Sequence, residues 1–294
     1  MSGPLPPVEL AILNGESMAF QRFGDDDAPT IVLVAGGASS MDWWDADFCE
    51  QLAAGDASSG PRRVIRYDYR DTGQSVTVPP GEGRYTDRDL LDDLAALIEH
   101  LHSAPVHAVG LSMGGALVQL LALDRPDLTA SITLMSTTPV TTRHLELPPP
   151  SESVSLGSPV TDWSDSAAVI DSIVASERLY SGSIPVDEAR IRRIATAVVS
   201  RTSSPASADN HWSSGEGQRP EGEIDSISVP TLVMHGSEDP LFPLPHGEKL
   251  AELIPGARLV VIPGMGHQHP PPPTWPQVVG ELLRHTDAGV RQRA

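Results

Sequence analysis

The chain has 294 residues, of which 39% are hydrophobic, and its formal net charge at pH 7 is -19. This length suits one large α/β domain that carries an inserted segment. Because proteins bind the phosphate backbone through Lys and Arg, so acidic a chain is not expected to bind nucleic acid. A single cysteine, Cys49, excludes an internal disulfide and a metal site built from several cysteines.

The first ten residues, MSGPLPPVEL, contain neither the basic segment nor the apolar run of a secretory signal. Nowhere in the sequence does an apolar run approach the length of a membrane span. The ten histidines include no H-E-x-x-H pattern. We therefore expect a cytoplasmic protein, monomeric or homodimeric, that needs no metal or cofactor and has no membrane partner.

Strand-like and helical patterns alternate along the first half of the chain. Residues 30–35 (TIVLVA) are almost continuously apolar, as a strand buried on both faces requires. The pair Asn14-Gly15 between two shorter strand candidates is a strong hairpin signal. The alternation predicts βαβ units and a mainly parallel sheet. The expected strands are Val8–Leu13, Ser17–Phe23, Thr30–Ala35 and Val64–Tyr67, and the expected helices are Trp43–Ala54 and Thr86–His102.

The alternation breaks between residues 139 and 222, which are rich in Pro, Ser, Thr and Gly. Two helical patterns in this stretch, Ser166–Tyr180 and Asp187–Arg201, each have one apolar side. Both are too short to form a core of their own, so we expect them to pack over the main domain as a mobile lid. The sequence thus predicts a core of residues 1–138 and 223–294 with a lid at 139–222. In the second part of the core, we expect strands at Thr231–His235 and Arg258–Ile262 and helices at Pro245–Ile254 and Trp275–His285.

A strand pattern runs directly into a helical pattern through GLSMG at residues 110–114. A G-x-S-x-G turn between a strand and a helix strains the backbone of the serine and exposes its hydroxyl at the carboxyl edge of a sheet. The same residues would also suit a glycine turn followed by a helix N-cap serine. We favour Ser112 as a nucleophile because the later chain supplies partners for it.

A serine hydroxyl is a weak nucleophile until a base takes its proton, and a third group must hold the tautomer of that base. Asp239 follows the strand candidate TLVMH, and His267 follows the strand candidate RLVVI. Glu238 and His269 are the nearest alternatives. Asp239 is preferred because the residue before a proline favours an extended conformation, and His267 because it lies closer to its strand.

Ester cleavage places negative charge on the former carbonyl oxygen, and two backbone N–H groups commonly bind it. Met113, directly after the candidate nucleophile, is expected to supply one of them. Gly37, which follows the first buried strand, is expected to supply the other. The alternative for Gly36-Gly37 is a tight turn with no role in chemistry.

Taken together, these segments resemble the α/β-hydrolase family across nearly the whole chain. VAGG at residues 34–37 stands where the family has its H-G-G loop, and RYDYRDTGQS at residues 66–75 resembles its D-x-R-G-x-G-x-S segment, with Asp71 where glycine is usual. GLSMGG, HGSEDP and PGMGH carry the serine, the acid and the histidine in the chain order of this family. More narrowly, the run from LFPLPHGEK to PGMGH is similar to methyl esterases that tailor aromatic polyketides of the anthracycline type.

The resemblance implies an α/β-hydrolase fold and a serine carboxylic-ester hydrolase that works through an acyl-enzyme. Its partner would be a small-molecule substrate, the methyl ester of a bulky polyketide-like acid, and Trp212 and Tyr180 are expected to line the pocket for it. Trp212 could instead only anchor the lid. Lactone hydrolysis, C–C bond hydrolysis and perhydrolysis by the same three residues are alternatives, as is a hydrolase homologue that only binds a ligand.

Overall fold

The computed structural model describes residues 5–152, 154, 162–215 and 217–291. Its strands are β1 (Glu9–Leu13), β2 (Glu16–Gly24), β3 (Thr30–Val34), β4 (Arg63–Tyr67), β5 (Val106–Leu111), β6 (Thr129–Met135), β7 (Thr231–Gly236) and β8 (Arg258–Ile262). They form one sheet in the order β1-β2-β4-β3-β5-β6-β7-β8. β2 pairs antiparallel with β1 and β4, and all other pairings are parallel. The mainly parallel sheet expected from the sequence is confirmed.

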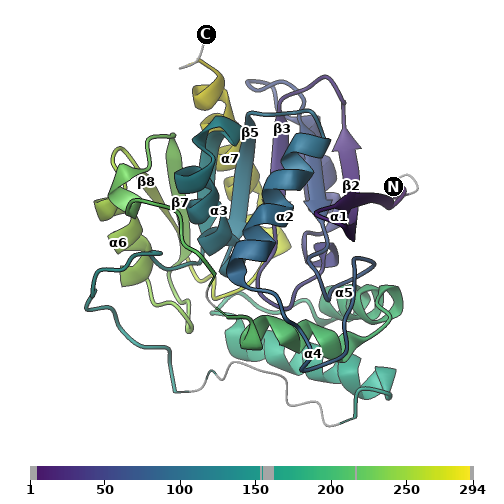
Figure 1. Cartoon of the computed structure of the whole chain (residues 1–294). Coiled ribbons are helices and arrows are strands. Elements are labelled where there is room, and N and C mark those ends of the chain that lie inside the picture. The colour runs from purple at the N-terminus through teal and green to yellow at the C-terminus, as the bar shows by residue number, and fades with distance from the viewer. Residues whose placement is uncertain (1–4, 153, 155–161, 216, 292–294) are drawn as a thin grey trace.

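The helices cover both faces of this sheet and form an insertion below it. They are α1 (Ala46–Ala54), α2 (Asp87–His100), α3 (Met113–Asp124), α4 (Ser166–Tyr180), α5 (Glu188–Arg201), α6 (Pro245–Leu253) and α7 (Trp275–Arg291), with 3-10 segments η1 (Met41–Trp43), η2 (Pro126–Leu128), η3 (Pro205–Ser213), η4 (Ile224–Ser226) and η5 (Pro272–Thr274). α2 and α3 pack on one face, and α1 and α7 pack on the other (Figure 1). Every residue of β3, β4, β5 and β6 is buried between these layers.

The expected helix Trp43–Ala54 is two elements in the structure, η1 and α1. Asp45 stands between them, and its carboxylate accepts a hydrogen bond from the N–H of Asp47 at 3.3 Å. An aspartate in this position caps a new helix, so α1 begins at Ala46. Because apolar residues stand on both sides of Asp45, the spacing of apolar residues alone does not reveal this break.

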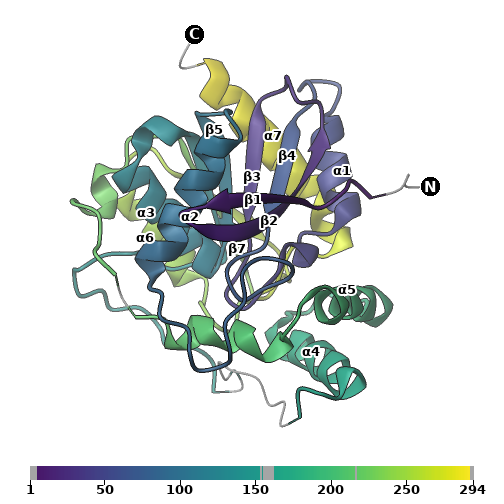
Figure 2. The ribbon, with the colours of Figure 1, turned by 45° about the vertical axis from the view of Figure 1, so that its right-hand side comes forward.

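α4 and α5 belong to the insertion between β6 and β7, and both match the expected helices to within one residue. They lie side by side beneath the sheet (Figures 1 and 2). Val174, Ile191 and Ile194 form a small apolar cluster between them, and Trp43 of η1 packs against it. The two helices therefore bury their apolar sides partly against each other and partly against the core. The mobility of this insertion as a lid remains a prediction.

Two arginines of α5 tie the insertion to the core by ion pairs. Arg190 Nε donates to Asp45 Oδ2 at 2.7 Å. Arg201 donates to Asp68 Oδ2 at 2.5 Å and also to Asp42. Because Asp68 is fully buried, loss of its partner would leave a desolvated charge, which typically costs about 3–5 kcal/mol.

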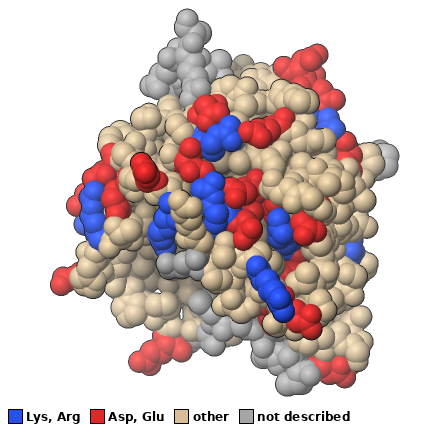
Figure 3. Space-filling view, in the orientation of Figure 1, with Lys and Arg blue, Asp and Glu red and all other residues tan. Residues whose placement is uncertain are grey.

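Acidic and basic side chains are interspersed over the face drawn in Figure 3. Among the ion pairs of the structure, Arg88 pairs with both Asp92 and Asp124. The drawn face therefore presents mixed charge, although the chain as a whole is acidic. Within the described ranges, no helix combines the length and the apolar character that crossing a membrane requires.

Glu177 of α4 is a buried carboxyl group where the insertion meets the core. Burial raises its pKa to about 7, although Arg190, a hydrogen bond from Gln268 and the nearby His267 each act to lower it. The folded protein therefore keeps a proton on Glu177 at pH values where the unfolded chain has released it. The stability that this proton contributes is fully present below the ordinary pKa of 4.5 and is lost as the pH rises through 7.

Replacement of Glu177 by Gln is expected to remove this pH dependence, because the amide keeps the acceptor for Gln268 and carries no charge. At pH 8 the Glu177→Gln variant should melt a few degrees above the wild type, which corresponds to roughly 1–3 kcal/mol. The difference should shrink as the pH is lowered to 5. Thermal melts across this range measure it, with Glu188→Gln, an exposed partner of Arg178, as the control. A stability difference that does not change with pH would contradict the prediction.

Candidate active site

Ser112 lies between β5 and α3 in a turn that only glycine neighbours permit. Its φ of 54° and ψ of -119° define a sparsely populated conformation that costs about 1–3 kcal/mol. A Cβ on Gly110 would lie 2.2 Å from the carbonyl oxygen of Gly114. A Cβ on Gly114 would lie 2.4 Å from the carbonyl oxygen of Ala35. The start of α3 approaches both β5 and the end of β3 so closely that both glycines of the motif are required, and Ser112 is held at the carboxyl end of β5.

The structure brings Ser112, His267 and Asp239 into one hydrogen-bonded line. Oγ of Ser112 lies 3.0 Å from Nε2 of His267, and Nδ1 of His267 lies 2.9 Å from Oδ2 of Asp239. Asp239 follows β7 and His267 follows β8, and parallel strands present their carboxyl ends at one edge of a sheet. An ionised carboxylate only accepts hydrogen bonds, so Nδ1 of His267 carries the proton and Nε2 faces Ser112 with a lone pair. A histidine in this state can take the proton of the serine.

The surroundings of Asp239 keep its carboxylate ionised. Burial would raise its pKa, but the hydrogen bond and charge of His267, the nearby His235 and the N–H of Phe242 together outweigh burial and hold the pKa below its usual value. The N–H of Leu241 also donates to this carboxylate, at 2.9 Å. The negative charge orients the ring of His267 and stabilises its cationic form.

Both alternatives that the sequence left open occupy other places. Glu238 accepts hydrogen bonds from the N–H and the hydroxyl of Ser183, at 2.7 and 2.9 Å. His269 is buried against the rings of Trp43 and Trp44, where burial lowers its pKa to about 3. Its Nε2 has no hydrogen-bond partner among the residues described. His269 is therefore a neutral packing residue.

Gly37 and Met113, the expected oxyanion donors, lie next to each other. Met113 is the first residue of α3, where backbone N–H groups have no acceptor within the helix. A Cβ added to Gly37 would lie 3.5 Å from Sδ of Met113 and 2.5 Å from the indole ring of Trp212. Only glycine at position 37 leaves room for the ring of Trp212 in this place.

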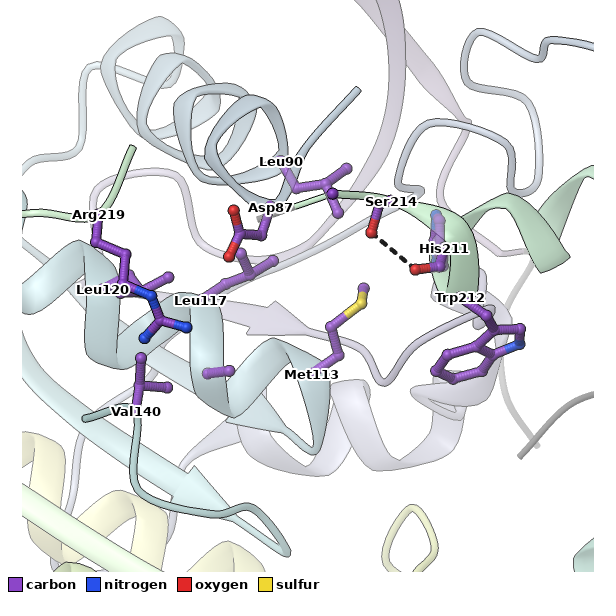
Figure 4. A pocket seen from close by; sticks show the side chains of 12 residues that line it. Asp87, Leu90, Met113, Leu117, Leu120, Val140, His211, Trp212, Ser214 and Arg219 are labelled. Carbon is purple, nitrogen blue, oxygen red and sulfur yellow. Dashed lines mark hydrogen bonds between the residues drawn. The ribbon is translucent and has the colours of Figure 1, made fainter. Parts of the chain in front are cut away.

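A cavity of about 290 Å³ begins beside Met113 and Trp212 and extends along α3 (Figure 4). Arg219 lies at the end opposite Trp212 in this view, and Asp87, also at the wall, accepts a hydrogen bond from the N–H of Gly217 at 2.6 Å. The remaining walls are largely aliphatic and include Leu90, Ala116, Leu117, Leu120 and Val140. The cavity thus offers an apolar volume next to the candidate oxyanion donors.

Trp212 and Tyr180, the two expected substrate contacts, lie at different parts of the site. Trp212 lines the cavity and is 45% exposed. Tyr180 ends α4, and its carbonyl oxygen accepts the N–H of His267 at 2.7 Å. The rings of Tyr180 and His267 have centroids 6.1 Å apart. The insertion therefore reaches both the cavity and the histidine.

Two residues that support the site were not predicted from the sequence. His211 of η3 accepts a hydrogen bond from the N–H of Ala38, next to Gly37. The hydroxyl of Thr137 donates to the carbonyl oxygen of Ser112 at 2.8 Å. Neither residue belongs to a motif, and the position of His211 beside Trp212 was the only signal. The described part of the chain holds no group of three or more His, Cys, Asp or Glu arranged to bind a metal ion.

Residues 31–281 match the model of the alpha/beta hydrolase family, and the chain belongs to this family. The fold expected from the sequence is thereby confirmed. The chain is 30% identical over 268 residues to rhodomycin D methylesterase DauP of Streptomyces sp. (strain C5), covering 85% of this chain and 88% of that protein. The narrower similarity to methyl esterases of the anthracycline type is thus also confirmed.

Two further comparisons extend over most of the chain. The bifunctional esterase/perhydrolase DCH of Acinetobacter calcoaceticus is 27% identical over 274 residues, which cover 87% of this chain and 91% of that protein. The crystal structure of the esterase RhEst1 from Rhodococcus sp. ECU1013 aligns with a TM-score of 0.72 at 19% identity, covering 95% and 98% of the two chains. At this identity, the structural likeness shows a shared fold.

Substitution of His267 and of His269 should separate the base from the packing residue. His267→Ala should lower kcat on p-nitrophenyl acetate by roughly 10⁵–10⁶-fold, the scale seen when a serine hydrolase loses its base. His269→Ala should lower the melting temperature, because it opens a cavity beside two tryptophans, and should retain most of the kcat. If His269→Ala lost more activity than His267→Ala, the base would have to be His269.

Proposed function

We propose that this protein is a serine esterase that hydrolyses carboxylic esters through an acyl-enzyme. The observation that carries the proposal is the hydrogen-bonded line from Ser112 through His267 to Asp239, with distances of 3.0 and 2.9 Å. Such a line lets the imidazole take the serine proton while the carboxylate stabilises the imidazolium that forms. A relative named as a methylesterase supports the same reaction class.

The reaction has two halves. Oγ of Ser112 attacks the ester carbonyl carbon while its proton passes to Nε2 of His267, and the intermediate carries its charge on the former carbonyl oxygen beside the N–H groups of Gly37 and Met113. The bond to the alkoxy oxygen then breaks, and this oxygen takes the proton from His267 and leaves as the alcohol. Water attacks the acyl-enzyme with His267 again as base, which releases the acid and restores Ser112.

For the substrate we infer the methyl ester of a bulky, polycyclic acid of the polyketide type. The cavity beside Met113 has about 290 Å³, close to the lower end of the range of about 300–1,000 Å³ typical of small-molecule sites. Trp212, which is 45% exposed, adds an aromatic surface to the wall of this cavity. The similarity to rhodomycin D methylesterase DauP supports this class.

The polar groups around the cavity suit a ring system that carries a few oxygen atoms. Arg219, Asp87 and Ser214 are polar residues on walls that are otherwise largely apolar, the usual composition of a site that orients its ligand. Tyr180, next to His267, is proposed as the contact for the part of the substrate nearest the reacting ester.

Perhydrolysis is the second candidate, because one relative is named as a bifunctional esterase/perhydrolase. In that reaction hydrogen peroxide takes the place of water, attacks the acyl-enzyme and leaves with the acyl group as a peracid. The first half of the reaction is the same, so only the second nucleophile distinguishes the two candidates.

Purified protein is expected to convert polycyclic methyl esters into methanol and the acid, as mass spectrometry of a panel of esters would show. A fluorophosphonate should label Ser112 and block turnover, and Ser112→Ala should lower kcat by up to roughly 10⁶-fold. Formation of more peracid than acid on addition of hydrogen peroxide would favour perhydrolysis. Labelling of a different serine would refute the assignment of the nucleophile.

Truncation of Trp212 tests the substrate class. Trp212→Ala should lower kcat/KM for a polycyclic methyl ester by roughly 10–100-fold, as the loss of an aromatic contact of about 1.4–2.8 kcal/mol predicts. Turnover of p-nitrophenyl acetate and the melting temperature should change much less, because the small ester carries no polycyclic ring system for the indole to contact. Equal losses on both esters, together with a lower melting temperature, would show instead that Trp212 anchors the insertion.

A further inference from the structure

The oxyanion loop, defined as residues 36–39, contains Gly37 and is contacted by one histidine of the insertion. We propose that the neutral imidazole of this histidine, His211, is a positioning residue that holds the loop in the conformation which aims the N–H of Gly37 at the developing oxyanion. The inference rests on the proposed function, in which this N–H binds the reacting oxygen. His211 acts through the loop and does not touch the substrate carbonyl.

The contact between His211 and the loop is a direct hydrogen bond. The N–H of Ala38, the residue after Gly37, donates to Nδ1 of His211 at 2.9 Å, across 173 positions of sequence. Ala38 has a φ of +57°, in the left-handed region that a residue with a Cβ rarely adopts. Local preference therefore disfavours this conformation, and the hydrogen bond to His211 is a contact from the insertion that helps to hold it.

The second ring nitrogen fixes the protonation state of His211. Nε2 lies 2.8 Å from the carbonyl oxygen of Arg70, which only accepts hydrogen bonds, so Nε2 carries the proton and Nδ1 carries a lone pair for Ala38. The rings of Tyr69 and Tyr85 pack nearly perpendicular to the imidazole, and burial lowers the pKa of His211. A protonated imidazole would have no acceptor for the N–H of Ala38, and the structure favours the neutral form that has one.

The segment that carries His211 is itself fastened to the core. Nδ2 of Asn210 donates to Oδ2 of Asp71 at 2.8 Å, and Oδ1 of Asn210 accepts the N–H of Gly81 at 2.7 Å. Oδ2 of Asp71 also accepts the hydroxyl of Tyr85 at 2.9 Å. Asp71, which stands where the family usually has glycine, thus has a physical role: its carboxylate accepts a hydrogen bond from Asn210, the residue before His211.

The effect of His211 should fall on the chemical step. Gly37 lies against Met113 and Trp212, so a small change at Ala38 moves the N–H of Gly37 relative to the start of α3. Misplacement of about 1 Å in a catalytic constellation can cost about 10²-fold in rate. His211 also lines the cavity, but the aliphatic walls would remain in a variant at this position, so ground-state binding of a small ester would change little.

Two variants distinguish the acceptor from the ring. His211→Phe keeps an aromatic ring without an acceptor, and His211→Asn places an amide oxygen near the position of Nδ1. On p-nitrophenyl acetate, His211→Phe should lower kcat by roughly 10–100-fold with KM within about threefold of the wild type. His211→Asn should recover a substantial part of the lost kcat.

A matched control is available in α7. His285 is also buried and also bonds a backbone carbonyl through Nε2, that of Ile132 at 3.0 Å, but it lies outside the site. His285→Phe should change the melting temperature as much as His211→Phe does and leave kcat unchanged. A comparable loss of kcat in the two Phe variants would mean that the effect is one of folding and would overturn the proposal.

The remaining outcomes are also decisive. Full kcat in His211→Phe, or equal losses in His211→Phe and His211→Asn, would refute a role for the acceptor. If His211→Phe does not fold, ¹⁵N NMR of histidine-labelled wild type decides: the proposal requires a protonated Nε2 and a bare Nδ1 on His211, and the opposite tautomer overturns it. A wild type that hydrolyses no ester refutes the proposed function instead, which separates the two failures.

Discussion

The close approach of the start of α3 to the backbones of β5 and of the end of β3 is the constraint on which the rest of the site depends. Carbonyl oxygens of Gly114 and Ala35 occupy the space that Cβ atoms at positions 110 and 114 would need. This contact holds Ser112 at a positive φ, presents its hydroxyl to Nε2 of His267 and places the N–H of Met113 at the free start of a helix. A looser turn would separate the nucleophile from both its base and the oxyanion donors.

The core and the insertion make different contributions. The strands of the core carry the residues of the hydrogen-bonded line, and the parallel sheet gives Ser112, Asp239 and His267 a common edge. The insertion carries Trp212 and His211, which lie at the cavity and at the oxyanion loop. Its attachment to the core through Arg190 and the pair of carboxylates around Arg201 therefore bears on the geometry of the site as well as on stability.

Burial gives the histidines of the site different tasks. His211, His235 and His269 are buried in places that lower their pKa values, so they remain neutral. His211 accepts the N–H of Ala38, His235 donates through Nε2 to the carbonyl oxygen of Phe242, and His269 packs against tryptophan rings. His267, in contrast, bridges an ionised carboxylate and the hydroxyl of Ser112. The hydrogen-bond partners of the ring nitrogens thus set the role of each histidine. For this reason His267 is the candidate base, whereas His269, two residues later, is a packing residue.

Local sequence by itself determined the main elements of the fold. Apolar periodicity located the sheet strands and the two helices of the insertion, and glycine spacing singled out Ser112, because these signals arise from neighbours a few residues apart. The positions of Asp239 and His267 after successive strands were visible for the same reason. Tertiary structure decided what depends on distant contacts: the break before α1, the burial of Glu177, the cavity beside Met113 and the hydrogen bond from Ala38 to His211. No local pattern encodes such contacts, since each joins segments that only the folded sheet and its insertion bring together.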